Sequence, residues 1–112
     1  MDKATLEALL VVAVRDGKCP ADVLRAAGEG WSVQSGVAGR AELLRSYRRR
    51  LRRTAEGSTL RQQTQQLVLF LEEFPDDQLT MVGATGDAGG YEMFLADAQE
   101  ERILFWMNMF SR

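Results

Sequence analysis

Hydrophobic residues recur every three or four positions through the first two thirds of the chain, the spacing that places them on one face of an α-helix. The first such stripe consists of Leu6, Leu9, Leu10, Ala13 and Val14. Asp2 is suited to the N-cap of this helix and Gly17 to its C-terminal stop. Pro20 then opens a shorter apolar segment with Val23 and Leu24, because proline is favoured in the first turn of a helix. The pattern predicts two helices before residue 28.

A loop and two longer helices are expected next. Residues 29–36 have no periodicity, which predicts a loop with Trp31 folded back onto the core. From residue 37 to 55 apolar positions are spaced by three or four throughout, which predicts a long helix. Its stripe consists of Val37, Ala41, Leu44, Tyr47, Leu51 and Ala55. Gly57 and Ser58 predict a helix stop and a new N-cap, and the following helix extends to about Phe74, where Pro75 ends it.

After Pro75 the period of the apolar residues changes to two, as in β-strands. Residues 78–84, 91–96 and 102–110 are rich in aromatic, β-branched and methionine residues. The segments that join them, 85–90 and 97–101, are short and turn-like in composition, which predicts hairpins. A helix over residues 96–107 is the alternative, because the sequence Ala-Asp-Ala-Gln-Glu-Glu-Arg favours helix locally.

These elements predict an α+β fold, with an N-terminal layer of three to four helices packed on a C-terminal three-stranded antiparallel meander. With 112 residues, 46% of them hydrophobic, we expect a single domain over residues 1–112. It is mainly helical up to residue 74 and a meander from residue 75. No apolar run reaches the ~20 residues of a membrane span, and the run at residues 8–14 is too short for a signal peptide. We therefore expect a cytoplasmic protein that does not engage a membrane.

Charge is sorted along the chain, although the formal net charge is only -2. Residues 40–61 contain eight arginines and two acids, whereas residues 72–101 contain nine carboxylates and no basic residue. Segregated charge of this kind indicates charged binding partners rather than a particular fold.

The arginine-rich helix at residues 40–53 provides one hypothesis for function. Arg45, Arg48, Arg49 and Arg52 are spaced i, i+3, i+4, i+7 and would line one flank of the helix. Such a flank can lie along a nucleic-acid backbone, where each neutralised phosphate contributes through counterion release. The same arginines can instead pair with the acidic half of the chain, and net basic character is absent. Nucleic-acid binding or regulation through this helix is therefore the alternative hypothesis.

The acidic segment and the aromatic strands provide the main hypothesis, a surface that binds a basic protein. Carboxylates accelerate the encounter with such a partner, and aromatic side chains that become buried dominate affinity. The last two strands are apolar on both faces, so a partner or a second copy of the chain, as a homodimer, is expected to cover one of them. The predicted partner-binding residues are Asp76, Asp77, Tyr91, Phe94, Asp97, Glu100, Glu101 and Trp106.

Catalysis is not expected from this composition. The chain has no histidine, which removes the commonest general base and metal ligand, and Cys19 is its single cysteine. The glycines at residues 83–90 match neither the dinucleotide fingerprint nor the phosphate loop, so we expect no cofactor and no metal. In size and acidity the chain resembles the bacterial immunity proteins that neutralise polymorphic or contact-dependent toxins. That resemblance implies a non-enzymatic inhibitor or adaptor for a basic toxin or effector.

Overall fold

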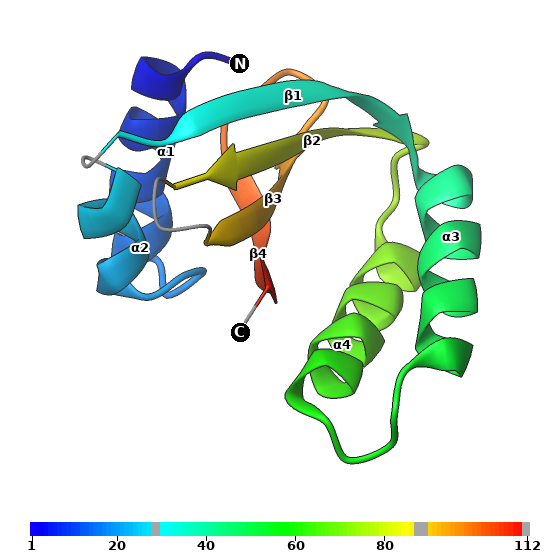
Figure 1. Ribbon diagram of the computed structural model, residues 1–112. Coiled ribbons are helices and arrows are strands. Elements are labelled where there is room, and N and C mark those ends of the chain that lie inside the picture. The colour runs from blue at the N-terminus through cyan, green and yellow to red at the C-terminus, as the bar shows by residue number, and fades with distance from the viewer. Residues whose placement is uncertain (28–29, 87–89, 111–112) are drawn as a thin grey trace. The chain divides into compact units, whose positions relative to one another are not determined.

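The computed structural model describes residues 1–27, 30–86 and 90–110, which form helices and strands of an α+β protein (Figure 1). In chain order the elements are α1 (Lys3–Arg15), α2 (Ala21–Ala27), β1 (Ser32–Gly39), α3 (Arg40–Arg53), α4 (Thr59–Glu73), β2 (Gln78–Thr85), β3 (Tyr91–Asp97) and β4 (Ile103–Phe110). The strands form one open antiparallel sheet in the order β1-β2-β3-β4. The α+β class and the three strands after Pro75 are confirmed, and residues 103–107 are strand rather than helix.

The sheet has one more strand than the sequence pattern predicts. β1 begins inside the segment expected to be a loop, and its last three residues were expected to start the long helix. Most of β1 is exposed on both faces, so its apolar and polar residues do not alternate and no strand period is visible. Pairing with β2, which lies more than 35 residues later in the chain, makes this segment a strand.

The chain divides into two compact units, which we call the sheet unit (Met1–Val37 with Thr80–Arg112) and the helical hairpin (Ala38–Leu79). The helical hairpin is a continuous insertion between β1 and β2. Each unit has buried apolar residues of its own. The expected single domain over residues 1–112 stays a prediction.

In the sheet unit, α1 and α2 cover one face of the sheet (Figure 1). The core on this face consists of Leu6, Leu10, Ala13, Cys19, Val23, Val82, Ala84, Phe94, Ala96 and Ile103. Local signals place α1 as the sequence predicts. The Asp2 carboxylate accepts the Thr5 N–H at 2.8 Å as an N-cap, which holds the pKa of Asp2 below its usual value. Gly17 lies just after the helix with a φ of 76°, a conformation that favours glycine.

In the helical hairpin, α3 packs against α4 through a small apolar core. Its buried residues are Leu43, Leu44 and Tyr47 of α3 and Thr64, Leu67, Val68 and Leu71 of α4. The predicted stripe of α3 is therefore only partly correct, because Leu43 is buried whereas Ala41 and Ala55 are exposed. The turn between the helices follows the sequence signals. Gly57 has a φ of 79°, and the Ser58 hydroxyl caps α4 by accepting the Arg61 N–H at 3.1 Å.

Candidate functional site

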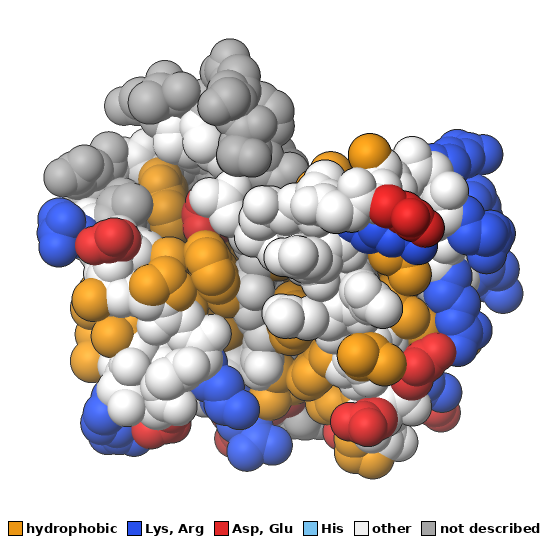
Figure 2. Space-filling model, turned by 90° about the horizontal axis from the view of Figure 1, so that it is seen from below, with side chains coloured by type: hydrophobic (Ala, Val, Ile, Leu, Met, Phe, Trp, Pro, Cys, Tyr) orange, Lys and Arg blue, Asp and Glu red, His pale blue; other side chains and the backbone are white. Residues whose placement is uncertain are grey.

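The outward face of α3 is a cluster of arginines. Four of them, Arg45, Arg49, Arg52 and Arg53, are exposed and spaced i, i+4, i+7 and i+8, a spacing that places them on the face opposite the buried residues of the helix. We call these four residues the arginine face. Figure 2 shows Lys and Arg side chains gathered along one edge at the position of α3. Within the described residues, none of the four forms an ion pair with a carboxylate.

The other arginines of the helical hairpin have structural contacts. Arg48 Nη2 lies 2.6 Å from Glu72 Oε2 of α4, so this side chain joins the two helices. Arg40 Nη1 donates to the Leu71 carbonyl at 2.9 Å, near the end of α4. The Arg50 guanidinium lies 5.3 Å from the centre of the Tyr47 ring, within the range of a cation–π contact.

Arg61 also supports the fold. Its Nη1 donates to the Leu51 carbonyl at 2.6 Å and to the Thr54 carbonyl at 2.9 Å. These carbonyls lie at the end of α3, where the helical hydrogen bonds run out; the Leu51 carbonyl also accepts the Thr54 backbone N–H at 3.3 Å. Of the four arginines that the sequence singled out, Arg45, Arg49 and Arg52 belong to the arginine face, whereas Arg48 pairs inside the hairpin. Arg53 takes its place on the outward face.

The arginine face is unfavourable for the helix that carries it. Arg45 and Arg49, and Arg49 and Arg53, are like-charge pairs at i, i+4, each of which costs about 0.2–0.5 kcal/mol. The helix C-terminus favours positive charge and offsets part of this cost for Arg52 and Arg53. It offers nothing to Arg45 and Arg49, which lie nearer the middle of α3. No ion pair among the described residues therefore offsets the repulsion between these like charges.

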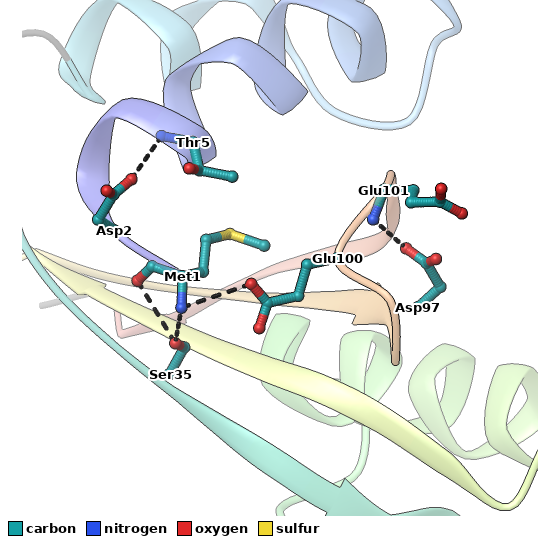
Figure 3. A network of polar contacts seen from close by, with 7 residues as sticks. All are labelled: Met1, Asp2, Thr5, Ser35, Asp97, Glu100 and Glu101. Carbon is teal, nitrogen blue, oxygen red and sulfur yellow. Dashed lines mark hydrogen bonds and ion pairs between the residues drawn. The ribbon is translucent and has the colours of Figure 1, made fainter.

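Two of the predicted partner-binding acids have structural contacts instead, as Figure 3 shows. Asp97 is buried and its Oδ1 accepts the backbone N–H groups of Glu101 at 2.8 Å and Arg102 at 2.9 Å, which ties together the turn between β3 and β4. Glu100 has a positive φ of 58° in this turn. Its Oε1 lies 3.6 Å from the amino group of Met1, and that amino group donates to Ser35 Oγ at 2.7 Å.

The remaining acids of the prediction are exposed but do not form one cluster within a unit. Asp76 and Asp77 belong to the helical hairpin, and Glu101 belongs to the sheet unit. Asp87, another member of the acidic segment, lies outside the described residues.

The predicted aromatic anchors are not free surface residues. Phe94 is 0% exposed and lies in the core of the sheet unit, where its ring centre is 6.2 Å from that of Trp31. Tyr91 is half-buried, and its ring lies over Gly83, where a Cβ atom would come within 2.6 Å of the Tyr91 hydroxyl. Alternation along a strand could not reveal that α1 and α2 cover the Phe94 face.

Trp106 is also half-buried and is bonded to a residue that the sequence did not single out. Its Nε1 donates to Glu92 Oε1 at 2.6 Å, across the β3–β4 pair. Burial raises the pKa of Glu92, and the Trp106 hydrogen bond opposes this shift in part. Burial also raises the pKa of the Cys19 thiol, and the charge of Glu92 raises it further. Both effects disfavour the thiolate form of Cys19.

The described residues contain no group of three or more potential metal ligands placed to hold an ion. Among these residues, no helix combines the length and apolar character of a transmembrane segment. The chain matches no family model, and it has no significant similarity to curated proteins or to solved structures.

Proposed function

We propose that the protein is a non-enzymatic binding module that docks the arginine face of α3 on the phosphate backbone of a nucleic acid. One observation carries the proposal. Arg45, Arg49, Arg52 and Arg53 are exposed on one side of a helix and have no ion-pair partner in the described residues. Arginine suits this role because its guanidinium group donates in a planar fork that matches phosphate oxygens.

The dimensions of the arginine face fit a short stretch of backbone. Residues 45–53 extend over about 12 Å of helix, since an α-helix rises 1.5 Å per residue. Four charges within this length meet the closely spaced phosphates of a duplex or a single strand. The outward face carries no aromatic side chain to stack on bases, so we expect contacts to phosphate and little sequence preference.

The main hypothesis from the sequence, an inhibitor of a basic toxin, has less support in the arrangement of its residues. Its aromatic anchors are buried or half-buried, and Asp97 is used by the β3–β4 turn. The acids still available to a partner are Asp76, Asp77 and Glu101. The immunity-type function therefore stays a prediction, and the arginine face carries the proposal.

The test is fluorescence anisotropy with labelled oligonucleotides, single-stranded and double-stranded, over a series of salt concentrations. We expect the logarithm of the association constant to fall with that of the salt concentration with a slope of about -3 to -4 on duplex DNA, as four phosphate contacts predict. This slope corresponds to a loss of about 100-fold between 50 and 200 mM salt. The variant R45Q/R49Q/R52Q/R53Q should lose most of the binding and most of the slope.

The matched control is R15Q/K18Q/R25Q/R102Q, which removes the same charge from exposed positions of the sheet unit. It should bind close to the wild type. Circular dichroism should show that both variants are folded. Equal loss in the two variants, or no binding at low salt with about 100 µM protein, would contradict the proposal. Capture of a basic protein that is abolished by charge reversal at Asp76, Asp77 and Glu101 would support the inhibitor hypothesis in its place.

A further inference from the structure

β1 forms an edge of the sheet that has neither the charged residues nor the proline by which proteins often protect such edges. It lies at the end of the strand order and is eight residues long. Its sequence, Ser-Val-Gln-Ser-Gly-Val-Ala-Gly, has no charged residue and no proline, in a chain of which 27% is charged. Edge strands normally carry a charge, a proline or a bulge, or are short, because their free backbone groups otherwise pair with another strand.

The backbone of β1 is available on its outer side. In the described part of the chain, the backbone groups of residues 32–37 bond to no element other than β2. Met1 contacts Ser35 and also lies 3.6 Å from Glu100 in the β3–β4 turn. The contacts between Met1 and Ser35 are made through the Ser35 hydroxyl and do not use the backbone N–H or C=O of Ser35.

The side chains along this edge are also exposed. Gln34, Ser35, Gly36 and Val37 are all exposed, and the Val37 side chain is 65% exposed. An extended peptide that adds a strand to a sheet is normally selected by pockets for its alternate side chains. The side chains of β1 are small or uncharged, so a strand of the same kind can lie beside them without steric or charge conflict.

From this edge we infer that β1 pairs with β1 of a second copy of the chain, in an antiparallel arrangement about a two-fold axis. The second copy supplies the small, uncharged strand that the edge requires, and no like charges meet across the contact. With the axis at Ser35, Val33 lies opposite the partner's Val37 on the same face of the sheet, a favourable cross-strand pair of β-branched residues. The result is a continuous sheet through both copies, closed by symmetry so that it does not extend into a fibre.

The inference is independent of the proposed nucleic-acid function, and charge placed on the edge tests it. In sedimentation velocity, the wild-type chain of 12.5 kDa should shift to twice this mass as its concentration rises through the micromolar range. In the variant Q34K/V37K the two lysines at position 34 lie diagonally across the seam on one face, and each copy adds two positive charges to the edge, so self-association should weaken at least about tenfold. The matched control L69K places a lysine at an apolar residue of α4 that is 54% exposed, and it should self-associate like the wild type.

A mixing experiment separates self-pairing from capture of another strand. Q34K/V37K and Q34E/V37E should each be monomeric alone, whereas an equimolar mixture should form a heterodimer, because the charges at position 34 of the two copies are then opposite and lie diagonally across the seam on one face. Circular dichroism should show that both variants keep the wild-type fold. A wild-type chain that stays monomeric up to about 1 mM would overturn the inference. So would a dimer that the lysine variant leaves unchanged, or a mixture that stays monomeric.

Discussion

Replacement of Asp97 by alanine should destabilise the protein strongly, although the residue looks like a surface acid in the sequence. Asp97 is 9% exposed, and its carboxylate accepts two backbone N–H groups, those of Glu101 and Arg102, in the turn between β3 and β4. A hydrogen bond to a charged group contributes about 1.5–3 kcal/mol, and the part of the turn that remains in contact with water recovers some of the loss. We expect Asp97→Ala to lower the free energy of unfolding by about 2–4 kcal/mol.

Two further variants show whether the hydrogen bonds are the cause. The amide oxygen of Asp97→Asn can still accept both N–H groups but has no charge, so we expect a smaller loss of about 1–2 kcal/mol. Glu101→Ala removes an exposed acid from the same turn and should change stability by less than about 0.5 kcal/mol.

The assay is urea unfolding followed by circular dichroism, with the slope compared among variants to verify that the transition stays two-state. In thermal unfolding, the alanine variant should melt about 10 °C or more below the wild type. If Asp97→Ala and Glu101→Ala have the same midpoint, the carboxylate does not stabilise the turn. Asp97 would then regain its place among the candidate partner-binding acids.

Two other variants test contacts that the sequence did not reveal. Burial raises the pKa of Glu92, so the folded state binds this proton more tightly than the unfolded state and stability falls as the pH rises through the folded-state pKa. Glu92→Gln should remove that decrease and raise the melting temperature at neutral pH, because its amide oxygen can still accept the Trp106 N–H. Thermal unfolding measured over a series of pH values checks this expectation. A pH dependence of the melting temperature equal to that of the wild type would contradict it. Arg61→Ala should lower the free energy of unfolding by about 2 kcal/mol, since two hydrogen bonds from a charged group are lost and the Leu51 carbonyl keeps only the Thr54 N–H. Nucleic-acid affinity measured below the melting temperature should stay at the wild-type value.

The sequence by itself determined the elements that depend on local chemistry. Asp2 and Ser58 accept the N–H groups that an N-cap side chain can reach, and Gly17 and Gly57 adopt positive φ after a helix. The change of period after Pro75 placed three strands correctly, because alternation reflects a face that is buried against a neighbour. These signals act over a few residues, so they are visible without knowledge of the fold.

Tertiary structure decided the elements and contacts that join distant parts of the chain. β1 is a strand because β2 pairs with it, and its exposed residues left no period to recognise. The sequence predicted that Phe94 and Asp97 would lie on a partner-binding surface. In the structure α1 and α2 cover Phe94, and the Asp97 carboxylate bonds the backbone of the β3–β4 turn.

The arginines of α3 also show what the sequence determines and what the structure adds. Its charge was visible in the sequence, but which arginines remain available depends on where α4 packs. Arg48 meets Glu72 across the hairpin and Arg61 reaches the end of α3, whereas Arg45 and Arg49 lie on the face opposite the α3–α4 core. The spacing of residues along a helix gives the direction of each side chain around the helix axis. The position of the neighbouring helix, which the spacing does not contain, decides which charges stay exposed to a partner.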